Sequence, residues 1–208
     1  MVDKKEWKAA YGKNDFAVLK DEVLADSFYQ LREVTVRHKT FSGDEITIKR
    51  DLFKRPSAVG VLLYDVTLDA VVLVEQFRVG ALVEPQGPWL LEIVAGIVET
   101  GEAIDEVATR ECYEESGLKV QTLEHLFTFS PSPGGSEENV DLFCALVDAS
   151  KAGGIHGLAT EGEDIKVHVL DAQEAINMLN MGKINNSFTI IALQWLALNR
   201  ARLLKKVE

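Results

Sequence analysis

Apolar and polar positions along the first quarter of the chain follow a pattern that predicts strands. Between residues 16 and 53, the segments 28–38 and 45–50 have strand character, and the turn-like Phe-Ser-Gly-Asp at 41–44 separates them. Two apolar runs follow at 58–64 and 70–75, and the link from Asp65 to Asp69 indicates a hairpin within a larger sheet. Residues 89–98 supply another strand. We therefore expect a small antiparallel N-terminal sheet ahead of a second, larger sheet.

A helix is expected next, at 102–116. This stretch contains no Gly or Pro, its first turn carries Asp105 and Glu106, and Gly117 follows as a C-terminal stop. Further strands are expected at 118–129, 139–147 and 165–170, and helices at 173–180 and 187–205. The order of elements predicts a mixed α/β or α+β sandwich without internal repeats.

Composition limits the classes of protein to consider. The 208 residues, 47% of them hydrophobic, suffice for one core plus a sizeable extension. The net charge of −11 argues against a nucleic-acid surface, and the longest apolar stretches, 89–97 and 190–198, are too short to span a bilayer. Cys112 and Cys144 lie in apolar segments and the N-terminus lacks an export signal, so we expect a reduced, cytoplasmic protein.

The expected helix carries carboxylates on the side that should face the sheet. At about 100° per residue, Glu111 and Glu115 fall within the apolar arc, and Glu114 lies at its edge. The arc itself is formed by Ile104, Val107, Ala108 and Cys112. Burial of an unpaired carboxylate is costly, so cationic side chains or a hard divalent cation should compensate the charges. Only Arg110 is close in sequence, although an ordinary solvated acidic helix remains the alternative.

The spacing of these residues resembles the signature of the Nudix hydrolases. Gly96 is followed after five residues by Glu102, and after seven more by Arg110 and Glu111. The remaining fixed positions hold Cys112, Glu114, Glu115, Gly117 and Leu118. Every fixed position of the signature is occupied, and Cys112 at the apolar position acts as a small hydrophobe.

This resemblance implies an α/β/α sandwich with a mixed sheet and a substrate built on a nucleoside diphosphate. It makes Glu111 and Glu115 direct ligands of Mg²⁺, with Mn²⁺ as a substitute and two or more ions in all. Glu114 would bind directly or through water, and the carbonyl of Ala95 would add a ligand. Arg110 and Glu102 would organise the catalytic carboxylates and the loop, with Gly96 and Gly117 as structural positions of the motif.

Beyond this motif the chain resembles the bacterial-type ADP-ribose pyrophosphatases over almost its whole length. The stretches that carry the resemblance are Tyr11-Gly-Lys-Asn-Asp15, Val74-Glu-Gln-Phe-Arg78, Pro88-Trp-Leu-Leu-Glu92, Ser132-Pro-Gly-Gly135, Gly154-Ile-His-Gly-Leu158, 161–169 and Ile191-Ala-Leu-Gln-Trp195. The resemblance implies hydrolysis of ADP-ribose to AMP and ribose 5-phosphate. It also implies a homodimer in which an N-terminal domain, residues 1–52, is exchanged and completes the site of the partner's catalytic domain, residues 53–208.

The same resemblance assigns further site residues. Phe28 and Arg50 are candidates for the adenosine end, and Arg78 for a phosphate or ribose. Strand packing for Phe28 and a surface ion pair for Arg78 are the alternatives. Glu161 is the preferred catalytic base, with Glu163 as an additional metal ligand or substitute base, unless the segment is simply a solvated loop. The 132–138 turn offers substrate contacts at Gly134, Gly135 and Glu138, of which the last could equally stabilise the turn.

Two other functions remain open. The motif fixes the anhydride chemistry and leaves the leaving group undefined, so a nucleotide sugar or dinucleotide is a rival substrate. A non-catalytic nucleotide sensor is the second rival, although such domains often lose the motif glutamates that this chain retains. The four histidines show no paired zinc spacing, and neither a phosphate-binding Gly-x-x-x-x-Gly-Lys loop nor a Gly-x-Ser-x-Gly elbow is present in the sequence.

Overall fold

The computed structural model describes residues 6–205, which divide into two compact units. The first unit runs to Arg55 and includes the separate segment Ser132–Glu138. The second comprises Pro56–Pro131 and the chain from Asn139 onward. Each unit is described by itself below.

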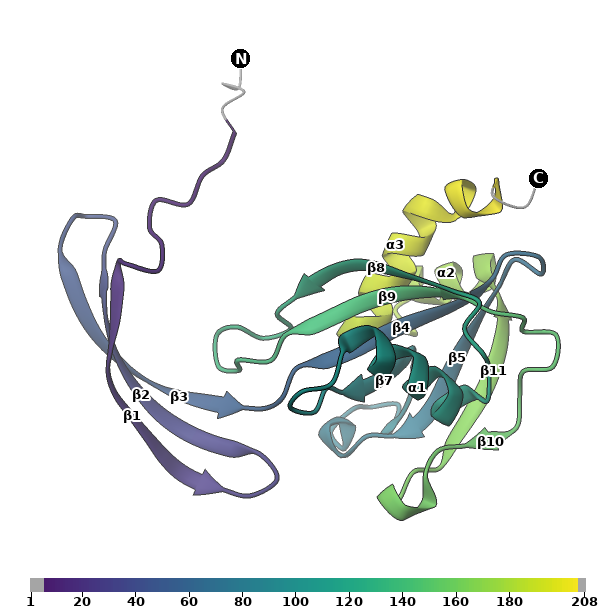
Figure 1. The fold of residues 1–208 in the computed structure, drawn as a ribbon, viewed down its shortest axis with the longest axis horizontal. Helices are drawn as coiled ribbons and strands as arrows, with labels where there is room; N and C mark the ends of the chain where they lie inside the picture. Colours follow the sequence, from purple (N-terminus) through teal and green to yellow (C-terminus); the bar gives the residue numbers. More distant parts are fainter. Residues whose placement is uncertain (1–5, 206–208) are drawn as a thin grey trace. The chain divides into compact units, whose positions relative to one another are not determined.

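The first unit is a three-stranded antiparallel sheet in the order β1-β2-β3 (Figure 1). Its strands are β1 (Phe16–Asp26), β2 (Gln30–Lys39) and β3 (Glu45–Lys54). The last two correspond to the expected segments, whereas β1 was not expected as a strand of its own. Its register against β2 shifts twice, between Val18 and Lys20 and between Val23 and Ala25, and such bulges break the alternation on which the prediction relies.

The second unit contains a mixed eight-stranded sheet. Its strands are β4 (Ala58–Asp65), β5 (Ala70–Phe77), β6 (Trp89–Glu92), β7 (Val94–Ile97), β8 (Thr122–Phe129), β9 (Val140–Leu146), β10 (Ile155–His156) and β11 (Ile165–Asp171). The order is β10-β11-β5-β4-β9-β8, and only the β4–β9 pair is parallel among the described strands. The single strand expected at 89–98 is divided at Ile93, because β6 pairs with β5 whereas β7 pairs with β4.

Helices cover both faces of this sheet. Helix α1 (Ile104–Ser116) lies on one face, and α2 (Ala172–Asn180) and α3 (Ser187–Leu204) lie on the other (Figure 1). Two short 3₁₀ turns, η1 (Val79–Ala81) and η2 (Ala159–Glu161), lie in the connections. The predicted α/β/α sandwich with a small antiparallel N-terminal sheet is confirmed.

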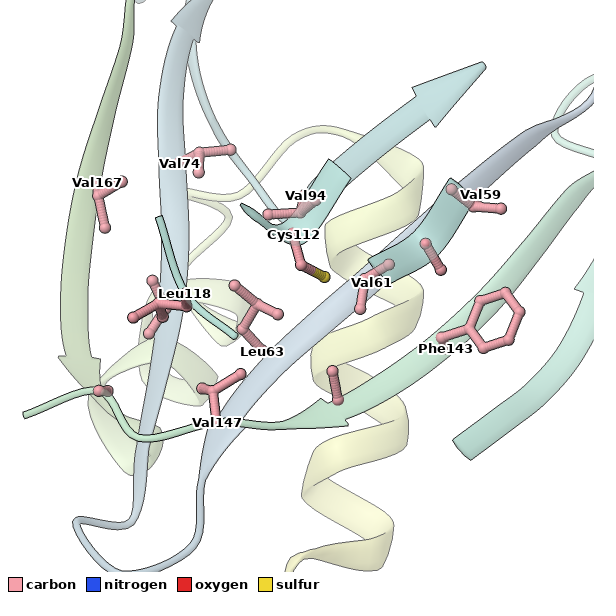
Figure 2. Packing of buried hydrophobic residues seen from close by; sticks show 14 of the residues in the cluster. Val59, Val61, Leu63, Val74, Val94, Cys112, Leu118, Phe143, Val147 and Val167 are labelled. Carbon is pink, nitrogen blue, oxygen red and sulfur yellow. The ribbon is translucent and has the colours of Figure 1, made fainter. Parts of the chain in front are cut away.

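Alternation along β4 explains how one sheet serves two cores. Val61 and Leu63 pack with Cys112 of α1, whereas Leu62 and Tyr64 belong to the core formed with α2 and α3. Figure 2 shows Val61 and Cys112 in the first of these cores. Because both faces of β4 are buried, its residues do not alternate between apolar and polar. This explains the continuous apolar run at 58–64.

Local signals set the helix ends. Helix α1 ends at Gly117, which has φ 70° and donates its N–H to the carbonyl of Tyr113 at 2.8 Å. The side chain of Asn186 accepts from the N–H of Thr189 at 3.0 Å and caps the start of α3. Within residues 6–205, no helix is both long and apolar enough to cross a membrane.

Candidate functional site

Glu115 is the most deeply buried carboxylate of α1. It is 2% exposed, and both of its oxygens are hydrogen-bonded. Oε1 accepts from Nε2 of Gln76 at 3.3 Å, and Oε2 accepts from the backbone N–H of Ala95 at 3.1 Å. Burial raises the pKa of Glu115 to about 8, against the lowering effects of the Ala95 N–H and the positive charge of Arg78. No ion pair compensates this charge within the described part of the chain.

Glu111 lies one helical turn before Glu115 and contacts the backbone of β7. A Cβ atom added at Gly96 would overlap the carboxyl group of Glu111, so any larger residue at this position would displace the Glu111 side chain. Burial raises the pKa of Glu111 to about 7; Arg110 opposes the rise, and the negative charge of Glu114 adds to it. Both carboxylates therefore lie in an environment that disfavours uncompensated negative charge.

Arg110 connects the acidic residues of the motif. Its Nη1 atom donates to Oε1 of Glu111 at 2.9 Å and to Oε2 of Glu114 at 2.8 Å. Its Nη2 atom lies 3.8 Å from Oε1 of Glu102. Oε2 of Glu102 accepts from the N–H of Glu99 at 2.9 Å and so closes the loop before the helix. The guanidinium of Arg110 thus lies among the carboxylates of Glu102, Glu111 and Glu114.

The two candidate base residues differ in their surroundings. Glu161 ends the η2 turn and is exposed, whereas Glu163 is half-buried. Oε2 of Glu163 accepts from the N–H of Leu158 at 2.9 Å. The negative charge of Glu163 contributes to the raised pKa values of Glu111 and Glu115, which burial mainly causes. Glu163 is therefore the loop carboxylate whose field reaches the helix carboxylates in this conformation.

Arg78 follows β5 and forms an ion pair, as its alternative assignment anticipated. Its Nε atom donates to Oε2 of Glu92 at 2.8 Å. Arg78 is 42% exposed at its side chain and Glu92 13%. Burial raises the pKa of Glu92, and the charge of Arg78 opposes the rise. Arg78 therefore remains partly exposed while it pairs with Glu92 through Nε.

The other candidate substrate residues belong to the first unit. Phe28 is 79% exposed between β1 and β2 and contacts the ring of Tyr29 edge-on, with centroids 4.7 Å apart. Arg50 is exposed on β3 and donates from Nη1 to the carbonyl of Lys49 at 2.8 Å. Both side chains are accessible in this unit.

The 132–138 segment packs on the end of β3. The carbonyl of Gly135 accepts from the N–H of Phe53 at 2.8 Å, and no atom lies within 4 Å of a Cβ built at Gly134 or Gly135. Glu138 is buried, and its Oε1 atom lies 3.2 Å from Nη2 of Arg55 without hydrogen-bond geometry. Burial raises the pKa of Glu138, and Arg55 opposes the rise.

The carboxylates of α1 suit a divalent cation chemically, although they are not gathered into a cage. Across residues 6–205, no three His, Cys, Asp or Glu side chains are grouped closely enough to hold a metal ion. The reason is local, because Glu111 and Glu114 are turned toward Arg110. The donors are all carboxylate oxygens, the type that Mg²⁺ and Mn²⁺ prefer, and the buried Glu115 forms no ion pair among the described residues. These residues therefore fit such an ion after a rotation of Glu111 or Glu114.

Two polar residues at this site were not singled out from the sequence. Gln76 is buried and donates to Glu115, and Glu92 orients Arg78. Gln76 occupies the next position after Val72 and Val74 on the face of β5 that packs against α1. A polar residue on this otherwise apolar face was the sequence signal that could have identified it. Glu92 carried a similar signal, as an acid that ends an apolar strand.

Comparisons with known proteins agree with this geometry. The sequence model of the NUDIX domain matches residues 54–206. An ADP-ribose pyrophosphatase of Haemophilus influenzae is 43% identical over 197 residues, which cover 93% of this chain and 91% of that protein. An ADP-ribose pyrophosphatase of Escherichia coli strain K12 is 42% identical over 194 residues, with 93% of both chains covered. A GDP-mannose pyrophosphatase of Salmonella typhimurium is 34% identical over 181 residues, covering 86% of this chain and 93% of that protein. With the complete signature on a loop, helix and loop beside a mixed sheet, the chain belongs to the Nudix hydrolase family.

Proposed function

We propose that this protein hydrolyses the diphosphate bond of ADP-ribose and releases AMP and ribose 5-phosphate. The observation that carries the proposal is Glu115, a buried carboxylate that forms no ion pair among the described residues and lies one helical turn from Glu111. Relatives named ADP-ribose pyrophosphatase align with 93% of the chain, which supports the choice of substrate.

The cofactor we propose is Mg²⁺, with Mn²⁺ as a substitute and two or more ions at the site. Nudix enzymes typically depend on divalent metals. Glu111 and Glu115 would be direct ligands, Glu114 would bind directly or through water, and the carbonyl of Ala95 would complete the set. Divalent cations held by these residues would neutralise charge on the diphosphate and lower the pKa of a bound water.

The proposed site residues then have defined roles in hydrolysis. The oxygen of a water attacks one phosphorus, the bond from that phosphorus to the bridging oxygen breaks, and the water gives up a proton to the base. We assign the base to Glu161, with Glu163 as additional ligand or substitute. Arg110 orients Glu111 and Glu114, and Arg78 binds the phosphate or ribose of the substrate.

The adenosine end would be bound by the first unit, and we propose that this unit acts across a homodimer. No residue of strands β1, β2 and β3 is buried in the described part of the chain, although these strands carry many apolar side chains. A three-stranded sheet needs a covered apolar face to be stable. Exchange with a second copy would cover this sheet and would bring Phe28 and Arg50 to the partner's catalytic domain. Gly134, Gly135 and Glu138 would then border the substrate.

A nucleotide sugar is the second candidate substrate. Relatives named GDP-mannose pyrophosphatase are 34–35% identical to this chain, against 42–43% for those named ADP-ribose pyrophosphatase. A non-catalytic sensor is less well supported, because the chain retains all the motif glutamates. We place the enzyme in the cytoplasm, where the buried thiol of Cys112 would stay reduced.

Product analysis tests the proposal. The purified protein is incubated in the presence of Mg²⁺ with ADP-ribose, GDP-mannose or a diadenosine polyphosphate in separate reactions. The products of each reaction are then separated chromatographically. We expect AMP and ribose 5-phosphate from ADP-ribose, and no products in the presence of a chelator. Binding of ADP-ribose without release of AMP would favour the sensor, and faster cleavage of GDP-mannose would favour the second candidate substrate.

A further inference from the structure

The loop that carries Glu161 and Glu163 is attached to the C-terminal end of helix α1. This loop, residues 157–164, connects β10 with β11, and His156 pairs with Ile165 at its base. Immediately after His156, the backbone N–H of Gly157 donates to the carbonyl of Glu114 at 3.1 Å. The loop thus begins with a hydrogen bond to a residue of the metal-binding motif.

The ring of His156 lies against Gly117, the glycine that ends α1. A Cβ at Gly117 would lie 2.6 Å from Cε1 and 3.2 Å from Nδ1 of His156, so any larger residue would displace the imidazole. Nε2 of His156 lies 2.9 Å from the carbonyl of Gly153. Because a carbonyl can only accept, Nε2 carries the proton in this bond. The imidazole is therefore fixed on one side by the 153–157 turn and packed on the other against the end of the helix.

Glu163 is held by the same turn. Gly157 has φ 95°, and a Cβ there would lie 2.8 Å from Cβ of Glu163. Leu158 donates its N–H to Oε2 of Glu163 at 2.9 Å, and Glu163 returns its own N–H to the carbonyl of Leu158 at 3.3 Å. A displacement of residues 156–158 would consequently move Glu163 as well.

We propose that His156 is a positioning residue that anchors the 157–164 loop to the end of α1 and so fixes the distance between the loop glutamates and the helix carboxylates. The inference rests on the proposed function for the roles of Glu161 and Glu163. His156 does not touch the reacting atoms. Its effect is on geometry, and a misplacement of about 1 Å can cost about 100-fold in rate.

Three substitutions separate the two contributions of the imidazole, its ring volume and its hydrogen-bond donor. His156→Ala removes both the ring and the donor, His156→Phe keeps the ring volume without the donor, and His156→Gln keeps a donor at the position of Nε2. His125→Ala is the matched control, because Nε2 of His125 lies 2.8 Å from Asp141 in β9, away from the loop. For each variant we would measure hydrogen–deuterium exchange of the 157–164 peptide, Mn²⁺ affinity, kcat and KM.

His156→Ala should speed exchange in the 157–164 peptide and lower kcat by about 10–100-fold, the cost of losing an orienting residue. Mn²⁺ affinity should fall less than in Glu115→Gln, because Glu111, Glu114 and Glu115 are untouched and the variant acts on the ion only through Glu163. His156→Gln should recover most of both losses, and His125→Ala should show neither. Unchanged exchange and unchanged kcat in His156→Ala would overturn the proposal, as would an equal loss in His156→Gln.

The exchange measurement also separates this inference from the proposed function. Should the wild-type protein release no AMP from ADP-ribose, the catalytic assignment fails, yet protection of the 157–164 peptide still decides whether His156 anchors the loop. Should His156→Ala fail to fold, His156→Phe provides the test. It should show faster exchange than wild type, and exchange equal to wild type would contradict the anchor.

Discussion

The carboxyl group of Glu111 lies in the space that a side chain at position 96 would occupy. Gly96 is placed there by β7, which pairs it with Val59 of the central strand β4. Helix α1 can therefore approach the sheet closely enough for the Glu111 carboxylate to lie over the strand. Gly96 thus leaves room for the Glu111 side chain, and its backbone lies outside the left-handed region that glycine favours.

Substitution of Gly96 by alanine should damage the site more than the fold. Alanine is compatible with a strand, but its Cβ would push Glu111 aside and away from any shared cation. We expect Gly96→Ala to lower kcat/KM by at least about tenfold and to weaken Mn²⁺ binding, with a small change in Tm. Gly80→Ala is the matched control, since no atom lies within 4 Å of a Cβ at that position. Wild-type kinetics in Gly96→Ala would show that Glu111 is free to move without consequence.

Glu115→Gln should separate metal binding from folding. The amide oxygen can still accept from the N–H of Ala95, whereas the negative charge is lost. Turnover should fall at least about 100-fold, because loss of a residue that only orients a ligand already costs about 10–100-fold. In chelator near pH 7, the variant should be as stable as the wild type or more so, because burial raises the pKa of Glu115 to about 8 and folding of the wild type must protonate this carboxylate.

Addition of Mg²⁺ should then raise the Tm of the wild type more than that of Glu115→Gln, because an ion stabilises the state that binds it. Thermal melts with and without Mg²⁺ measure this difference. Equal shifts in the two proteins would contradict the assignment of Glu115 as a ligand.

Asp69 should make the stability of the second unit depend on pH. It accepts from the hydroxyl of Tyr64 at 2.6 Å and from Nε of Arg200 at 2.8 Å, and so connects the β4–β5 hairpin to α3. The bond from Arg200 is the main cause that lowers the pKa of Asp69. A lowered pKa stabilises the fold above the unfolded value of about 3.9, and this contribution is lost as the pH falls through the folded value.

Asp69→Asn should therefore lower the free energy of unfolding at pH 7 by about 1.5–3 kcal/mol, the range for hydrogen bonds to charged groups. The difference from wild type should shrink as the pH approaches 3. Asparagine tolerates the positive φ of 52° at this position, so backbone strain does not confuse the result. Urea denaturation at both pH values provides the measurement, and a difference independent of pH would argue against the ion pair as its origin.

Mixing two inactive variants should reveal whether the N-terminal sheet acts on the partner. Phe28→Ala impairs the proposed adenosine contact of the first unit, and Glu115→Gln impairs the catalytic domain. If the first unit serves the partner's site, a heterodimer of these chains has one intact site. Random reassortment at a 1:1 ratio should then restore about one quarter of wild-type activity, since half of the dimers are mixed and half of their sites are intact.

The same mixture should stay inactive if each first unit serves its own chain. Sedimentation of the wild type must also show a dimer for the proposal to hold. A Phe28→Ala protein that is fully active by itself would remove Phe28 from the binding site and leave Arg50 as the candidate to test.

Much of the second unit could be predicted because its signals are local. Helix α1 lacks breakers and ends at a glycine, and the continuous apolar run of β4 marks a strand that is buried on both faces. Features that depend on distant partners could not be predicted. The division of the 89–98 segment at Ile93 reflects pairing with two different strands, and the role of Gln76 depends on a residue 39 positions away.

Within the site, the spacing of the motif indicated which carboxylates matter but not what they contact. Glu111 approaches Gly96 only when α1 packs on β7, and Arg78 reaches Glu92 only when β5 pairs with β6. Similarly, the imidazole of His156 meets Gly117 because the β10–β11 hairpin returns to the end of α1.

The central claim is that Glu111 and Glu115 share a divalent cation, and a crystal soaked in Mn²⁺ tests it most directly. Data collected at the manganese absorption edge should show an anomalous peak within about 2.0–2.3 Å of a carboxylate oxygen from each residue, the usual range for hard divalent ions. Glu111 should have rotated away from Arg110. A map in which both side chains keep their present hydrogen bonds, with no anomalous density between them, would contradict the account.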